Sequence, residues 1–229
     1  MGIRTMQTHF EKDLEELKRR LLEMASHAES STKRAIKALV ERDDDLARRV
    51  ITDDNTLDRF EMEIDDLAVT ILSKAPLATD LRLITVAMKI SRNLERVGDE
   101  ATTIARRSLE LSQEPLLKPY VDIPRMGTMA LEMLASALGA FVRGDPGAAR
   151  LVVPRDKEVD ALNKQLYREL SSFMIEKPST ITRCLNLMVI SKAIERIADH
   201  AANIAEDVVF LFEGRDIRHA SGAAKGAAS

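Results

Sequence analysis

Residues 88–105 read MKISRNLERVGDEATTIA, and residues 188–205 read MVISKAIERIADHAANIA, so the chain repeats one pattern a hundred residues later. Nine of the eighteen positions are identical. Apolar positions can recur because each copy packs a core, but a Glu and an Asp four residues apart repel each other on a helix by a few tenths of a kcal/mol. The repeated pairs Glu95/Asp99 and Glu195/Asp199 therefore point to a bound cation. The period also predicts two similar halves.

The amino-acid composition favours a protein of long, half-exposed helices that does not span a membrane. Of the 229 residues, 45% are hydrophobic, 31% are charged and only 3% are aromatic, which argues against a β-sandwich or barrel. A net charge of −3 gives no general attraction to nucleic acid. No apolar stretch approaches the roughly 20 residues that span a membrane. The single cysteine, Cys184, excludes an internal disulfide, so we expect a cytoplasmic protein.

Helical periodicity predicts six long helices, separated by turn-forming residues. We expect the first four at about 8–41, from 43–45 to 71, from 79–80 to 111 and at 125–142, while the fifth follows the turn at 144–147 and runs to about 175 and the sixth follows Pro178 and ends near 213–214. Pro115, Pro119 and Pro124 crowd the middle of the chain, which is typical of a boundary between repeats. The predicted fold is all-α, with two tandem three-helix bundles at 8–112 and 120–214, followed by a largely disordered tail at 215–229.

The duplication extends to acidic residues of the middle helix in each half. The sequence from Asp54 to Asp58 corresponds to that from Asp156 to Asp160, two residues out of step. Residues four apart lie about 5–6 Å from each other on one helix face. Each half therefore brings together four carboxylates, and the predicted metal ligands are Asp54, Asp58, Glu95, Asp99, Asp156, Asp160, Glu195 and Asp199.

Helical phase places Glu95 and Asp99 off the apolar stripe, so we expect both sets on the bundle surface. Oxygen-only ligands indicate a hard cation, namely Mg²⁺, Ca²⁺, Mn²⁺ or iron. Acidic residues at helical spacing can also form a simple solvated face. A metal-free helical interaction module and a carboxylate-bridged metalloenzyme, either a hydrolase or an oxidase, therefore remain open as alternatives. The residues show no arrangement typical of a catalytic triad or a phosphate-binding loop.

The chain resembles the PhoU family of bacterial regulatory proteins from about Thr8 to His219. The most specific elements are Glu95-Arg-Val-Gly-Asp99 and Glu195-Arg-Ile-Ala-Asp199, together with the segments at 76–82 and 213–219. The family is built from two three-helix repeats, and its acidic motifs bind clustered metal ions in some members. Two positions depart from the repeated pattern. Ala198 replaces the glycine seen at Gly98, and Thr103 corresponds to Asn203.

The resemblance implies signalling rather than catalysis. PhoU proteins repress the phosphate-starvation response, and they connect the ATPase subunit of the phosphate ABC transporter to a sensor histidine kinase. The same resemblance implies a homodimer that is peripheral to the membrane at most. On this reading, the eight carboxylates would form metal-binding patches on a regulatory adaptor that is not an enzyme.

Overall fold

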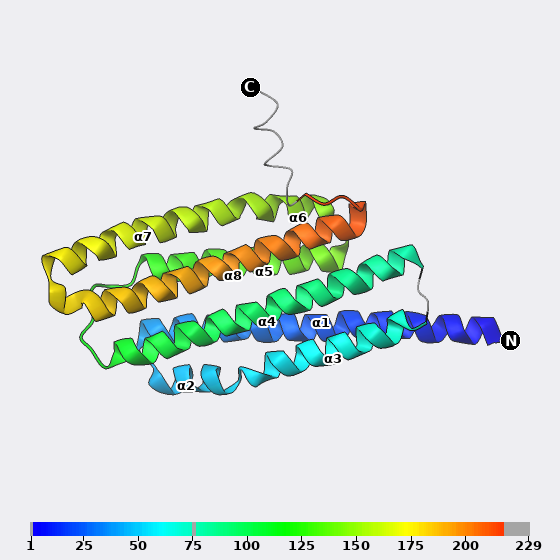
Figure 1. Cartoon of the computed structure of the whole chain (residues 1–229), viewed down its shortest axis with the longest axis horizontal. Coiled ribbons are helices and arrows are strands. Elements are labelled where there is room, and N and C mark those ends of the chain that lie inside the picture. The colour runs from blue at the N-terminus through cyan, green and yellow to red at the C-terminus, as the bar shows by residue number, and fades with distance from the viewer. Residues whose placement is uncertain (1, 75–76, 218–229) are drawn as a thin grey trace, which may run out of the picture.

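The computed structural model describes residues 2–74 and 77–217, and the side chains of residues 2–9 are not described. Its regular structure is helical throughout these ranges (Figure 1). The elements in chain order are α1 (Gly2–Glu41), α2 (Asp44–Thr52), α3 (Asn55–Leu72), α4 (Ala78–Ser112), α5 (Asp122–Arg143), α6 (Pro146–Val152), the 3₁₀ turn η1 (Val153–Arg155), α7 (Asp156–Glu176), the 3₁₀ turn η2 (Pro178–Thr180) and α8 (Ile181–Glu213).

Two three-helix bundles make up the fold, as the sequence predicts. In the first, α1 and α4 pack against each other and against α3, with α2 continuing the line of α3. In the second, α8 packs against both α5 and α7, and α6 lies roughly in line with α7. The helices bury their apolar stripes, including Leu17, Ile90, Leu134 and Ile194. Among the described residues, no helix is both long and apolar enough to cross a bilayer.

The second and fifth predicted helices are each interrupted, contrary to the prediction of continuous helices. In the first bundle, α2 ends at Thr52 and α3 begins at Asn55. The residues between them are Asp53 and Asp54, whose short side chains compete for backbone hydrogen bonds and favour helix ends. In the second bundle the interruption is η1, which contains Pro154. Proline cannot donate the backbone hydrogen bond that a continuous helix needs.

Other boundaries differ less. Helix α1 begins at Gly2 rather than near Thr8, and α4 begins at Ala78, with Leu77 in the N-cap position. Thr79 and Asp80 therefore lie in the first turn of α4. The expected break at Pro76 and most of the predicted tail, residues 218–229, lie outside the described residues.

The turns that end α1 and α5 are built alike. Asp43 Oδ1 accepts a hydrogen bond from the backbone N–H of Leu46 at 2.8 Å, and Asp145 Oδ1 accepts one from Ala148 at 2.9 Å. Each carboxylate thereby caps the N-terminus of the next short helix. The preceding residue has positive φ in both turns, +56° at Arg42 and +65° at Gly144.

The bundles join through α4 against α8 and α1 against α5. Contacts between α4 and α8 show that they are antiparallel: Arg82 Nη1 donates to the Leu211 carbonyl at 3.3 Å, and Arg196 Nη1 lies 3.1 Å from Glu100 Oε1. The start of α4 thus meets the end of α8. The colours of Figure 1 run in opposite directions along this pair.

Candidate functional site

A cleft of about 950 Å³ lies between α4 and α8, beside the two interruptions in the middle helices. Carboxylates from both predicted sets line it, namely Asp54 and Asp99 from the first bundle and Asp156 and Asp199 from the second. The interruptions place Asp54 just before α3 and Asp156 at the first residue of α7. Both carboxylates therefore sit where the helix dipole favours negative charge. The sequence predicts one carboxylate patch per bundle. In the structure, two aspartates of each patch line the same cleft.

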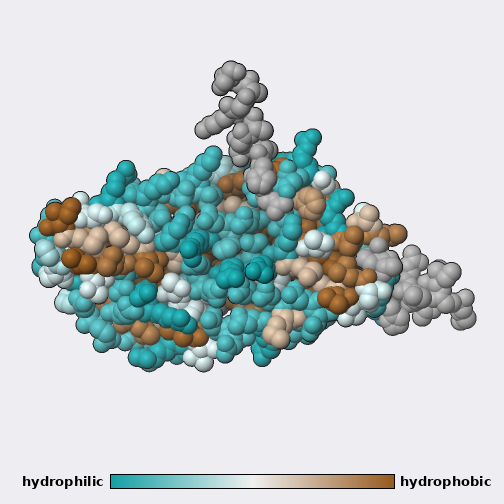
Figure 2. Space-filling model, viewed as in Figure 1, coloured by the Kyte–Doolittle hydropathy of each residue, from teal (hydrophilic) through white to brown (hydrophobic). Residues whose placement is uncertain are grey.

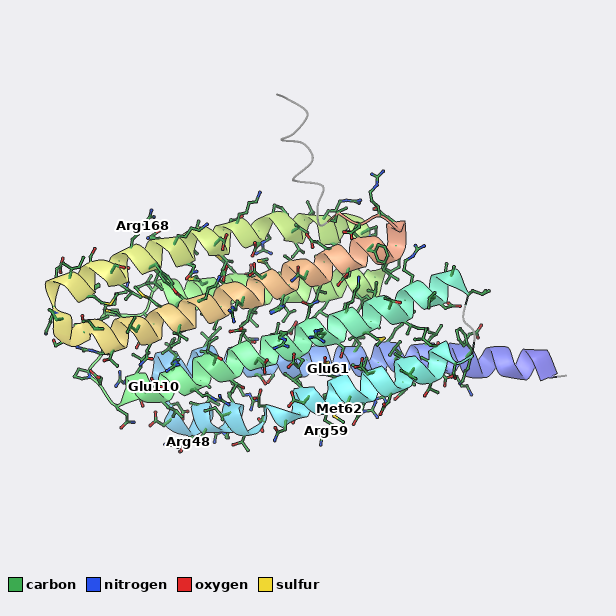
Figure 3. All side chains as sticks on the ribbon, viewed as in Figure 1. Arg48, Arg59, Glu61, Met62, Glu110 and Arg168 are labelled. Carbon is green, nitrogen blue, oxygen red and sulfur yellow. The ribbon has the colours of Figure 1, made fainter. Side chains whose placement is uncertain are left out.

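The first set gathers around Glu95. Burial, together with the nearby negative charges of Asp99, Glu61 and Asp58, raises the pKa of Glu95 to about 7 against the opposing effect of Arg96. Glu61 lies on α3 (Figure 3). Burial also raises the pKa of Asp54, although that carboxylate accepts a hydrogen bond from Thr102 Oγ1 at 2.9 Å. These carboxylates are therefore close enough to repel one another.

The second set has the same arrangement. Burial and the neighbouring Asp156 raise the pKa of Asp199 to about 6. Burial likewise raises the pKa values of Asp156 and Glu195, and the neighbouring Asp160 acts on both in the same direction. Asp156 Oδ1 is buried and has no hydrogen-bond partner. Each set also has a basic partner, since Lys192 forms an ion pair with Glu195 in the second set and Arg96 forms one with Glu95 in the first.

The expectation that both sets lie on the bundle surface does not hold for the glutamates. Glu195 is only 5% exposed, and the Glu95 side chain is 16% exposed. Asp58 is exposed, whereas the aspartates that line the cleft are half-buried. The helical phase of one bundle shows which face turns away from its own core. It cannot show how far the middle helix of the same bundle covers that face: α3 carries Asp58 and Glu61 near Glu95, and α7 carries Asp160 near Glu195.

The positions where the two repeats differ also lie at the site. Thr103 and Asn203 both line the cleft. A Cβ atom added to Gly98 would stand 2.2 Å from Leu57 Cδ1, so α3 and α4 approach closely at this point. Ala198 occupies the corresponding position in the second bundle, where the counterpart of Leu57 is the smaller, buried Val159.

Several polar residues of the cleft were not singled out from the sequence. Glu100 pairs with Arg196 across the two bundles, and His200 Nδ1 lies 3.0 Å from Asn93 Oδ1. Burial and the positive charges of Arg96 and Arg196 lower the pKa of His200. Glu61 could have been found, since it continues the helical spacing of Asp54 and Asp58. The cross-bundle partners carried no such signal, because their contacts join residues about a hundred positions apart.

The carboxylates cluster without forming a ready-made metal cage. Within residues 2–74 and 77–217, no group of three or more His, Cys, Asp or Glu side chains is arranged to hold a metal ion. The chemistry of the donors nevertheless suits a hard cation, since the two sets offer carboxylate oxygens that burial and mutual repulsion leave poorly compensated.

Comparison with known proteins gives one consistent family. The model of the PhoU domain matches residues 21–108 and again residues 123–208, one match per bundle. The phosphate-specific transport system accessory protein PhoU homolog of Pseudomonas aeruginosa is 40% identical over 212 residues, covering 92% of this chain and 88% of that protein. The accessory protein PhoU of Escherichia coli is 36% identical, covering 93% of this chain and 89% of its own length.

Solved structures agree with the sequence matches. The crystal structure of PhoU from Pseudomonas aeruginosa superposes with a TM-score of 0.87 at 39% identity, covering 90% of this chain and all of that one. The phosphate transport system regulatory protein PhoU from Streptococcus pneumoniae gives a TM-score of 0.85 at 27% identity, covering 91% and 99%. With both bundles matched and several relatives covered along most of their length, the chain belongs to the PhoU family.

Proposed function

We propose that this protein is a regulatory adaptor of phosphate-specific transport that represses the phosphate-starvation response when phosphate is plentiful. The observation that carries the proposal is the match of both bundles to the family, together with relatives named as accessory proteins of phosphate-specific transport. In this role the protein acts in the cytoplasm by contact rather than by catalysis. Its partners would be the ATPase subunit of the phosphate ABC transporter and a sensor histidine kinase.

A deletion strain tests this role. In phosphate-rich medium, a reporter fused to a phosphate-starvation promoter should be switched on in the deletion strain, and the full-length chain supplied from a plasmid should switch it off again. An empty plasmid is the control. Normal regulation of the reporter in the deletion strain would show that the adaptor proposal is wrong.

We further propose that the two carboxylate sets bind hard cations such as Mg²⁺, Mn²⁺, Ca²⁺ or iron. The oxygen-only donors support this, as do the raised pKa values of Glu95 and Asp199, because a bound cation would offset the repulsion among these groups. The first set would draw on Asp54, Asp58, Glu95 and Asp99, and the second on Asp156, Asp160, Glu195 and Asp199.

Metal analysis of protein purified without chelator tests the cation proposal. We expect bound metal in the wild type and less in Asp99→Asn and in Asp199→Asn. Asp66→Asn, on the exposed face of α3, is the matched control and should leave the metal content unchanged. Chelator should lower the melting temperature of the wild type, since an ion bound only by the folded state stabilises it. Metal content that is negligible, or equal in all four proteins, would contradict the proposal.

A further inference from the structure

A second cavity, of about 570 Å³, lies at the end of the molecule where α4 begins and α8 ends. We call it the end pocket, and its lining includes Lys18, Arg82, Phe141, Arg143 and Phe212. Helices α1, α4, α5 and α8 all contribute to the wall, so residues of both bundles form it. Its volume lies in the range of pockets that hold small molecules. None of the eight predicted metal ligands lines it.

The wall of the end pocket is mainly apolar. Phe141 and Leu211 are its buried members. Leu22, Val142 and Phe212 also line it but remain exposed to solvent. Figure 2 shows hydrophobic colour gathered at this end of the molecule, toward the right of the view. Apolar side chains exposed around a concave surface are typical of a site that binds an apolar group.

Three cations line the end pocket against a single carboxylate. The cations are Lys18, Arg82 and Arg143, and the carboxylate is Asp80. Arg82 Nη1 already donates to the carbonyl of Leu211 at 3.3 Å. Asp80 lies in the first turn of α4, where the helix dipole favours its negative charge. Lys18 and Arg143 have no carboxylate partner within the part of the chain that the structure describes, so their positive charge is left for a ligand.

A glycine inside α5 places one of these cations. Gly139 lies in the helix interior, where glycine is less stable than alanine. The nearest atoms that a Cβ at Gly139 would meet belong to Arg143, with Nη1 3.0 Å away. A Cβ at Gly127 in the same helix would instead meet Ile36 of α1. Helix packing therefore explains Gly127 but not Gly139, whose small size lets the Arg143 guanidinium lie against α5 at the end pocket.

The lining determines which ligand chemistry fits. Its positive charge favours an anionic head group. Thr79 is the only neutral polar side chain of the wall, so a nucleotide or a sugar would leave its own polar groups without hydrogen bonds. A fatty acid has an apolar chain with no such groups and a compact carboxylate. Both parts match the end pocket.

We propose that the end pocket binds a medium-chain fatty acid, with its carboxylate at Lys18 and Arg143 and its acyl chain against the apolar wall. Neither the regulatory role nor bound cations are needed for this binding. Because helices of both bundles form the pocket, the bound fatty acid ties the bundles together and stabilises the folded chain.

Calorimetric titration of the full-length chain with dodecanoate, kept below the concentration at which it forms micelles, tests the proposal. We expect saturable binding of about one molecule per chain. Dodecanol, which has the same chain without the charge, should bind at least about tenfold more weakly. Val142→Asp should weaken dodecanoate binding about tenfold, because it places a like charge in the wall. Val69→Asp on α3 is the matched control, since Val69 is 62% exposed and Val142 59%, and it should bind like the wild type.

Two variants of α5 separate binding from folding. Arg143→Gln should weaken dodecanoate binding about tenfold, while Arg59→Gln on α3 should leave it unchanged. Gly139→Ala should raise the melting temperature, because alanine is the better helix former, yet weaken binding about threefold by displacing the guanidinium of Arg143.

Each other outcome overturns the inference. Absence of saturable dodecanoate binding, or equal affinity for dodecanol, would exclude a fatty-acid site. Equal losses in Val142→Asp and Val69→Asp, or unchanged binding in Arg143→Gln and Gly139→Ala, would place the bound molecule elsewhere on the chain. Binding to vesicles of phosphatidylglycerol without binding of dissolved dodecanoate would assign this end of the molecule to a membrane surface instead.

Discussion

At the scale of single residues, the carboxyl groups of α4 share a partly buried site with too little positive charge. Arg96 contacts both Glu95 and Asp99, at 3.3 Å and 3.2 Å, yet the pKa of Glu95 still rises to about 7. Burial is the main cause, because it disfavours the charged form. In metal-free protein, ionised Glu95 therefore weakens the folded state.

The sign of this effect gives a testable pH dependence. An unfolded glutamate ionises near pH 4.5 and folded Glu95 near pH 7, so its contribution to the free energy of unfolding falls as pH rises between those values. Glu95→Gln removes that loss. In the presence of chelator, the variant should melt at a higher temperature than the wild type at about pH 8, and the difference should shrink toward about pH 4.5.

Glu11→Gln, which changes an exposed glutamate on α1, is the control and should show no such trend. A difference between Glu95→Gln and the wild type that stayed constant with pH would contradict the assignment. Added Mg²⁺ or Mn²⁺ should reverse the order of the two proteins if Glu95 is a metal ligand.

The acidic residues themselves could be predicted from the sequence, because four carboxylates recur in both halves at helical spacing. Their burial could not. Glu195 lies at the same phase of its helix as Glu95, which predicts exposure, but the middle helix of each bundle approaches that face, with Asp58 and Glu61 of α3 near Glu95 and Asp160 of α7 near Glu195. A sequence contains the phase of each helix, whereas how closely a neighbouring helix covers that phase depends on how the bundle packs.

At the scale of elements, close packing of α3 on α4 depends on a glycine. The space that a Cβ at Gly98 would need is filled by Leu57 Cδ1, 2.2 Å away. At the corresponding positions the second bundle has Ala198, which is larger than glycine, and Val159, which is smaller than leucine. This exchange of volume suggests that each repeat keeps the same helix spacing by a different pair.

Gly98→Ala should destabilise the protein by about 1–2 kcal/mol, because overpacking outweighs the better helix propensity of alanine. In a Leu57→Val background, the same change should stabilise by about 0.5–1 kcal/mol, since the space is then available. Urea unfolding of the four proteins measures both values. Additive effects of the two substitutions would contradict the proposed contact between these side chains.

The interruptions in the middle helices show what an apolar pattern leaves out. Leu46, Val50, Leu57 and Ile64 follow helical spacing closely enough to predict one helix, yet the chain breaks at Asp53 and Asp54. The sequence does contain helix-breaking residues at both interruptions, namely Asp53-Asp54-Asn55 in the first bundle and Pro154 in the second. An apolar stripe that resumes after a local break looks continuous, so the cap-forming residues, and not the stripe, locate the break.

At the scale of the whole molecule, a buried ion pair helps to hold the bundles together. Lys89 Nζ on α4 lies 3.3 Å from Asp207 Oδ1 on α8 and 5.3 Å from the centroid of the Phe210 ring. The Asp207 side chain is only 8% exposed, whereas that of Lys89 is 35% exposed. Removing the cation would leave a buried carboxylate with less compensation.

Lys89→Met should therefore lower the free energy of unfolding by about 2 kcal/mol, less than for a fully buried pair because Lys89 is partly exposed. The double variant Lys89→Met/Asp207→Asn should recover part of that loss. Lys37→Met breaks an exposed pair with Glu41 and should change stability by less than about 0.5 kcal/mol. Equal losses in Lys89→Met and Lys37→Met would show that the buried pair makes no special contribution.

The antiparallel packing of α4 on α8 also has a consequence for synthesis on the ribosome. The helices of the first bundle are complete at Ser112, but the helix that covers α4 ends only at Glu213. At a typical rate of chain elongation, roughly 5–20 s separate these two points. During that interval Glu100 and Asn93 lack Arg196 and His200, their partners across the cleft. The nascent first bundle thus presents half a cleft, open to other proteins, until its own second half arrives.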